Sequence, residues 1–303
     1  MSKEFVTLEN DRIVVEVMPG RGAKIASIRT PADGEWLYFD PARGLGTGKN
    51  PEVYDDVWVG GFEELFPNDA KTTFAGRSLR DHGELWNSPW EVVFSSRNLV
   101  SLQLRCTTVP AVVRKSISLD PSAARFTIAY RLENLDDKPF AYLFKLHPAV
   151  RLEPGDRILM PGGRITQVDK SFSAILGGPG PYDWPHVRGR DGRPCDLSLV
   201  PDPSSMTQEF VYVSDLPSGW CGLRRGSTGS EFRLEYPLHV FPYCWLFLTY
   251  GGWRDYYTAV LEPCTNHPKD LATAVESGTS AILSPGELKE FSIAVTVESA
   301  RSR

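Results

Sequence analysis

The sequence lacks the features that mark secreted disulfide-rich proteins and membrane proteins. Its five cysteines, an odd number, are widely spaced and contain no CxxC pair. This pattern favours reduced thiols in a cytoplasmic protein. No apolar run approaches the ~20 residues that a membrane-spanning helix needs. The opening residues MSKEFVTLEN also lack the apolar segment of a signal peptide.

Positive charge is scarce as well. Lys and Arg together number 33 against 38 Asp and Glu, which gives a formal net charge of −5 over 303 residues. Nucleic acids and anionic membrane surfaces attract basic faces that can replace their counterions. We therefore expect neither as a partner.

Helical patterns are few, and short strand-like runs dominate. The best helix candidate is the stretch 267–278, with Pro268 near its start and Gly278 at its end. Runs rich in Val, Ile, Phe, Tyr and Thr recur between Gly- and Pro-containing turns, at 12–17, 90–95, 99–106, 112–119, 125–132, 140–146, 209–214, 231–236, 243–250, 256–262 and 290–297. Strands without alternating helices predict an all-β protein of stacked antiparallel sheets, and no boundary divides the expected single domain, 1–303.

Two long stretches look irregular. The segments 40–70 and 160–208 are rich in Gly, Pro and Asp, and 160–208 is the longer. Loops of that length inside a domain are usually functional or disordered. The aromatic residues Tyr182 and Trp184 argue against complete disorder of the second segment.

The stretch LRDHGELWNSPW, residues 79–90, combines acids, an imidazole and flat aromatic rings on what reads as a loop. We expect it to form one wall of a ligand cleft. In this interpretation His82 and Glu84 bond ligand hydroxyls, Trp86 covers an apolar ligand face, and Asp81 lies beside His82.

Two other polar residues end strongly apolar strands, and both directly precede a proline. His147 follows FAYLFKL, and Glu262 follows YYTAVL. The residue before proline is held extended, and proline cannot donate a hydrogen bond to a central ladder, so each pair predicts a strand end at a rim or cleft. Lys145 lies two residues before His147 and is therefore expected on the same strand face.

In their order along the chain, GGFEELFPN, DHGELW, KLHP and LEP resemble the aldose 1-epimerase (galactose mutarotase-like) family. The resemblance implies a large antiparallel β-sandwich, the mutarotase supersandwich, with few short helices and an open sugar cleft. It implies no cofactor, Glu262 as general base, His147 as general acid to the ring oxygen, and His82 as the residue that places the sugar.

Further positions follow from the resemblance. Asn68 matches the upstream asparagine of the family and joins the expected sugar-binding residues, with Asp81, Glu84, Trp86 and Lys145. The arginine that the family carries near that asparagine is absent, and Pro148 and Ala149 replace its Ser-aromatic pair. The expected ligand is a sugar, free or phosphorylated.

Three alternatives compete with anomer exchange. A sugar-binding module of the same fold would bind without catalysis, because fold does not fix function. A glycoside hydrolase or lyase would use a carboxylate pair drawn from Glu63, Glu64, Asp81, Glu84 and Glu262. A metal enzyme would use His82, Glu84, His147 and Glu262 as ligands.

Overall fold

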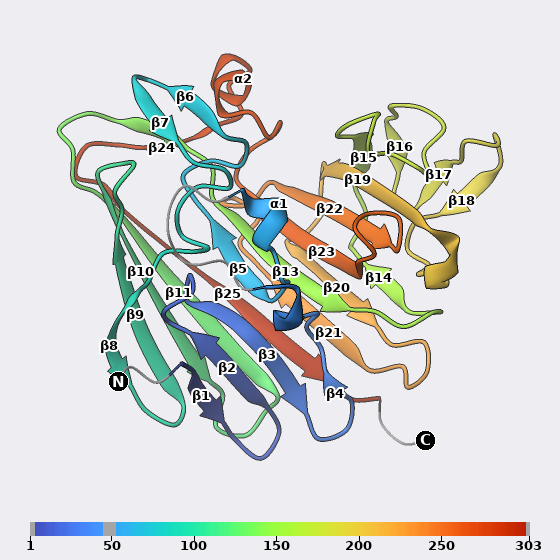
Figure 1. The fold of residues 1–303 in the computed structure, drawn as a ribbon, viewed down its shortest axis with the longest axis horizontal. Helices are drawn as coiled ribbons and strands as arrows, with labels where there is room; N and C mark the ends of the chain where they lie inside the picture. The colour runs from blue at the N-terminus through green and yellow to red at the C-terminus, as the bar shows by residue number, and fades with distance from the viewer. Residues whose placement is uncertain (1–3, 45–52, 301–303) are drawn as a thin grey trace.

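The computed structural model describes residues 4–44 and 53–300, and in them the chain folds as two large β-sheets packed face to face (Figure 1). Every pairing between named strands is antiparallel, as in β13 with β5 and β23, or β10 with β9 and β11. The prediction of a large all-β antiparallel sandwich with few short helices is therefore confirmed. None of the described helices is both long enough and apolar enough to cross a membrane.

The first sheet contains the strands on which the cleft is built. In the described residues its order is β1 (Val6–Glu9), β2 (Val14–Met18), β3 (Lys24–Thr30), β5 (Phe62–Leu65), β13 (Lys145–Arg151), β23 (Tyr257–Cys264), β22 (Tyr243–Tyr250), β19 (Thr207–Ser214), β15 (Arg164–Gln167), β16 (Tyr182–Asp183), β17 (His186–Arg188) and β18 (Pro194–Asp196), with β4 (Gly34–Glu35) beside β3.

The second sheet covers the core side of the first. Its order is β14 (Arg157–Leu159), β20 (Trp220–Arg224), β21 (Glu231–Glu235), β25 (Leu288–Glu298), β11 (Arg125–Asn134), β10 (Ala111–Leu119), β9 (Leu99–Arg105) and β8 (Glu91–Ser95). Two small ribbons stand at one end in Figure 1, formed by β6 (Thr72–Phe74) with β7 (Arg77–Leu79) and by β12 (Phe140–Tyr142) with β24 (Ala281–Leu283).

The helices are short. They are α1 (Tyr54–Val57), α2 (Leu271–Glu276) and 3-10 turns at Pro41–Arg43 and Pro203–Ser205. The helix expected in 267–278 is confirmed in its central part. The Asp270 side chain caps α2 by accepting a hydrogen bond from the Thr273 backbone, and Gly278, at a φ of +69°, lies just beyond its end.

The segment 160–208 is more regular than its composition predicts. Strands β15 to β18 and a 3-10 turn lie within it, because its Gly and Pro residues form tight turns between very short strands. The expectation of one long irregular loop there is wrong. In the other irregular stretch, 40–70, the structure contains α1 and β5, and residues 45–52 lie outside the described residues.

Side-chain alternation divides the first sheet into a core face and a cleft face. In β13, Leu146 and Val150 join the main core between the sheets, whereas Lys145 and His147 point the other way, as the period of two predicts. Strand β22 behaves likewise: Leu246 packs in the core, and Phe247 lies on the cleft face.

One ion pair links the sheets inside the core. Glu64 of β5 faces the second sheet, where its carboxylate lies 2.7 Å from the Lys115 ammonium and accepts a 2.6 Å hydrogen bond from the Tyr130 hydroxyl. All three side chains are fully or almost fully buried. Burial raises the pKa of Glu64, and Lys115 opposes that rise.

We expect Lys115→Met to lower the free energy of unfolding by about 3–5 kcal/mol, because it leaves the Glu64 carboxylate buried without a counter-charge. Urea denaturation measures this loss. The double variant Lys115→Met/Glu64→Gln is expected to recover part of it, since a neutral amide costs less to bury. Equal losses in both variants would contradict the pairing.

Candidate active site

The cleft face of the first sheet carries a cavity with a polar floor and aromatic walls. Lys145, His147 and Glu262 form the floor, and Trp58, Phe247 and Trp253 are among the aromatic residues that line it. Tyr54 and His82 complete one side. These residues come from α1 and the residue that follows it, the 79–90 loop, the neighbouring strands β13, β22 and β23, and the turn between β22 and β23.

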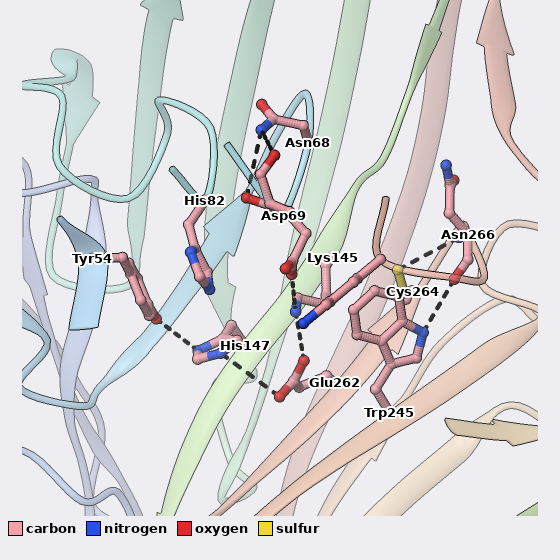
Figure 2. A network of polar contacts seen from close by, with 12 residues as sticks. Tyr54, Asn68, Asp69, His82, Lys145, His147, Trp245, Glu262, Cys264 and Asn266 are labelled. Atoms are coloured by element: carbon pink, nitrogen blue, oxygen red, sulfur yellow. Dashed lines mark hydrogen bonds and ion pairs between the residues drawn. The ribbon is translucent and has the colours of Figure 1, made fainter. Parts of the chain in front are cut away.

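Strand register aligns three ionisable side chains across this floor. His147 lies directly opposite Glu63 of β5. The pairs Lys145↔Cys264 and Ala149↔Val260 flank the position at which His147 faces Glu262 of β23. The His147 Nδ1 atom is 3.7 Å from Glu63 Oε1, and its Nε2 atom is 3.7 Å from Glu262 Oε1. One imidazole thus lies between two carboxylates (Figure 2 shows the Glu262 side).

Lys145 holds the far side of Glu262. Its ammonium lies 2.6 Å from Glu262 Oε2, forms an ion pair with Asp69, and sits 4.3 Å from the centre of the Trp245 ring (Figure 2). Burial by itself would lower the pKa of Lys145, but Asp69 and Glu262 together raise it. Lys145 therefore stays charged and fixes one oxygen of Glu262, which leaves Oε1 facing His147.

Burial shifts the pKa values of the two floor residues in opposite directions. It raises the pKa of Glu262, against the attraction of Lys145. It lowers the pKa of His147 well below the usual value, and the charges of Lys145, His82 and Lys24 lower it further. Desolvation disfavours the charged form of each group, which is anionic for Glu262 and cationic for His147.

His82 lies in a strained turn. Its φ is +56°, and its backbone N–H donates to the Asp69 carbonyl at 2.7 Å. The next residue, Gly83, has a φ of +69°, and a Cβ atom there would lie 2.1 Å from the Phe66 carbonyl oxygen. The backbone of this turn therefore requires glycine at position 83, and the same turn places the His82 imidazole at the cavity.

Two neighbours fix the His82 ring. Its Nδ1 atom lies 2.9 Å from Asp81 Oδ1, and its ring stacks on Tyr54 with centroids 3.8 Å apart. Burial lowers the pKa of His82, but the nearby carboxylates Asp69 and Asp81 outweigh burial and raise it. Asp81 also accepts a 2.9 Å hydrogen bond from the Tyr54 backbone N–H, so it positions both rings without lining the cavity itself.

Like Asp81, three other expected sugar contacts do not line the cavity. Glu84 is buried, and its carboxylate accepts four hydrogen bonds, from the backbone and hydroxyl groups of Thr107 and Thr108. The Asn68 amide donates to the carbonyls of residues 70 and 80 at 2.8 and 2.7 Å. Trp86 donates to the Asp81 carbonyl and meets the Tyr54 ring edge-on. All three build the loop that carries His82, which corrects the roles expected for them.

Among residues 4–44 and 53–300, no three His, Cys, Asp or Glu side chains cluster in a way that could hold a metal ion. The four metal ligands that the metal-enzyme alternative requires do not come together, because the Glu84 carboxylate is bonded to Thr107 and Thr108.

The chain matches no protein-family profile and no curated protein. Its fold does match solved structures. The Slr1438 protein from Synechocystis sp. PCC 6803 superposes with a TM-score of 0.71 at 18% identity, over 99% of both chains. A candidate aldose 1-epimerase from Klebsiella pneumoniae gives 0.74 at 14% identity, over 96% of this chain and 78% of that one. A galactose mutarotase related enzyme from Lactobacillus acidophilus gives 0.67 at 16% identity, over 97% of both.

The chain has the galactose mutarotase-like fold. This confirms the fold that the resemblance implied. The low identities limit the likeness to the fold, so the activity has to be argued from the site.

Within this mutarotase-like fold, several cavity residues escape sequence reasoning. Tyr54 lies in an irregular stretch, and Asp69 looks like an ordinary turn residue. Phe247 reads as core because its strand is apolar throughout. Glu63, which lies beside the cavity floor, is one of several carboxylates in the sequence. The available signal was the strand FEEL of β5, in which alternation must send one glutamate to each face.

We expect Glu84→Ala to destabilise the protein by about 1–3 kcal/mol, because it removes the buried acceptor of four hydrogen bonds from the exposed Thr107 and the half-buried Thr108. Urea denaturation tests the loss, and calorimetric sugar titration of the folded variant tests the site. Sugar affinity should stay unchanged. A variant with normal stability and weakened sugar binding would restore the role first expected for Glu84.

Proposed function

We propose that the protein is an aldose 1-epimerase, which interconverts the α and β anomers of a sugar by acid–base ring opening. The observation that carries the proposal is the pair on the cavity floor, with His147 Nε2 and Glu262 Oε1 3.7 Å apart. A ring oxygen and an anomeric hydroxyl are bonded to the same sugar carbon. An acid and a base placed this close can therefore act on both at once.

In the proposed reaction Glu262 takes the proton of the anomeric hydroxyl. The bond between the anomeric carbon and the ring oxygen breaks, its electron pair goes to the ring oxygen, and protonated His147 gives that oxygen a proton. The open-chain aldehyde rotates about its bond to the next carbon. The ring then closes from the other face while both protons return. No electron is gained or lost, so the chemistry needs no redox cofactor.

The opposite pKa shifts support this exchange of roles. An isolated glutamate and histidine differ in pKa by about two units, with the histidine higher. Burial raises the pKa of Glu262 and lowers that of His147, so both shifts act against this ordinary difference. Each group must act as acid in one half of the reaction and as base in the other. Shifts in these directions make it easier for His147 to give up a proton and for Glu262 to hold one.

The remaining cavity residues suit a sugar. Trp58 and Trp253 offer flat apolar surfaces on the wall, and sugars present apolar faces to such rings. His82 lines the same cavity with its Nδ1 atom already bonded to Asp81. Its Nε2 atom is therefore the ring nitrogen left to bond a sugar hydroxyl, in line with the placing role implied by the family resemblance.

We expect Glu262→Gln to slow anomer exchange by about 10²–10⁴-fold, because the amide cannot accept the anomeric proton. Polarimetry or NMR exchange spectroscopy across a panel of aldoses measures the rate. Glu64→Gln is the matched control, since Glu64 is equally buried but faces the core. It should retain activity in the folded fraction. A Glu262→Gln variant as active as the unaltered protein would contradict the assignment.

The charges of the cavity favour an unphosphorylated sugar. Lys145 is already paired with Asp69 and Glu262. Phosphate recognition calls for cationic donors that converge on the anion. Among the described lining residues, carboxylates outnumber lysines by four to two: Asp55, Asp69, Asp169 and Glu262 against Lys145 and Lys269.

We expect kcat/KM for a neutral aldose to exceed that for its 6-phosphate by at least about tenfold, a difference of about 1.4 kcal/mol. Added salt should reduce this difference in kcat/KM, because it screens the repulsion between the sugar phosphate and exposed carboxylates. Asp169→Asn, which removes one rim charge, should narrow it too. A preference for the phosphate would show that the substrate class is wrong.

A further inference from the structure

Tyr54 connects His147 to a second buried carboxylate. The Tyr54 hydroxyl donates to Glu63 Oε1 and lies 3.2 Å from His147 Nδ1 (Figure 2 shows the contact with His147). The other Glu63 oxygen is 2.6 Å from the Lys24 ammonium, which also donates to the Gly60 carbonyl at 3.0 Å. Glu63, Tyr54 and His147 thus form a continuous chain on the side of the imidazole away from Glu262.

The direction of each hydrogen bond in this chain is determined. Glu63, paired with Lys24, is a carboxylate that only accepts. The Tyr54 hydroxyl has a single proton, and it is committed to Glu63. Burial and then the charge of Glu63 raise the pKa of Tyr54 well above its usual value, so that proton stays in place. The Tyr54 oxygen can then only accept from His147, and the imidazole hydrogen must be on Nδ1.

The Tyr54 ring has little freedom to move out of this chain. It stacks on the His82 ring with centroids 3.8 Å apart, and it packs edge-to-face with the Trp86 ring with centroids 4.8 Å apart. Its backbone N–H is bonded to the Asp81 carboxylate. The side chains of Tyr54, Glu63 and His147 are buried, so water does not compete for the bonds.

We propose that Tyr54 and Glu63 are positioning residues that hold the neutral imidazole of His147 with its hydrogen on Nδ1 and its free lone pair on Nε2, facing Glu262. This inference rests on the proposed function for its catalytic meaning. The tautomer itself is a property of the free protein and does not depend on turnover.

The chain also affects the protonated state of His147. Positive charges reach the imidazole from Lys24 on β3, from Lys145 on its own strand and from His82 in the loop. Glu63 on β5 and Glu262 on β23 face it with negative charge. When Nε2 gains a proton, the Nδ1 hydrogen still points to Tyr54, and the Glu63 carboxylate behind it offsets part of the new charge. The imidazolium needed to protonate the ring oxygen therefore becomes easier to form.

Nitrogen-15 NMR of uniformly labelled histidine side chains tests the tautomer directly. Comparison with His147→Gln identifies the His147 signals. We expect the unaltered protein at neutral pH to show a protonated Nδ1 and an unprotonated Nε2. A protonated Nε2 in the unaltered protein would overturn the proposal, whatever the activity.

Tyr54→Phe keeps the ring and removes the acceptor, so the His147 hydrogen is expected to move to Nε2. In the proposed reaction kcat should fall by roughly 10–100-fold, the range found when partners that orient a metal-bound imidazole are removed. KM should change little, because the aromatic wall remains. An unchanged tautomer and kcat in Tyr54→Phe would overturn the positioning role.

Tyr256→Phe is the matched control. Tyr256 is buried in the same aromatic cluster, but its hydroxyl donates to the Trp58 carbonyl, away from His147. It should leave the tautomer and kcat unaltered. A protein with the Nδ1 tautomer that exchanges no sugar anomers would contradict the proposed function and leave the tautomer assignment standing, so the two failures are distinguishable.

Discussion

The antiparallel register of β5, β13 and β23 is the constraint on which the whole site depends. It sets Glu63, His147 and Glu262 side by side on one face of the sheet, although they are far apart in the chain. Their neighbours in the same strands, such as Glu64 and Leu146, point into the core. A slip of one residue in any strand would exchange the two faces. The core that stabilises the sandwich thereby also fixes the positions of Glu63, His147 and Glu262, which we call the polar row.

Burial gives this row its chemical character. A carboxyl and an imidazole respond to desolvation with opposite pKa shifts, so a single environment raises the proton affinity of Glu262 and lowers that of His147. Lys145 keeps its charge only because Asp69 and Glu262 surround it. The aromatic wall then does two things, since it excludes water from the charged groups and offers flat surfaces to a ligand.

The strands could be predicted from the sequence because hydrophobic alternation and turn residues are local patterns. Alternation predicted that Lys145 and His147 share a strand face, and both line the cavity with Glu262. The strand ends predicted from the prolines are wrong, because Pro148 lies within β13 and Pro263 within β23. The pairs Lys145↔Cys264 and Ala149↔Val260 continue the ladder past both prolines. The side-chain directions in the 79–90 loop could be predicted only in part. His82 faces the cavity as expected, but Glu84 and Trp86 turn away from it. The backbone is left-handed at His82 and Gly83, which changes the direction of the chain there. Neither the two-residue period of strands nor the 3.6-residue period of helices predicts where side chains point in such a turn.

The sequence by itself determined the all-β class, the alternation that separates core from cleft, and the choice of His147 and Glu262 as the proposed acid–base pair. These follow from local rules of backbone geometry and hydrophobic periodicity. Tertiary structure alone decided which partners surround that pair. Tyr54, Glu63 and Asp69 reach it through cross-strand register and loop packing, and such contacts depend on how distant segments meet rather than on any pattern within one of them.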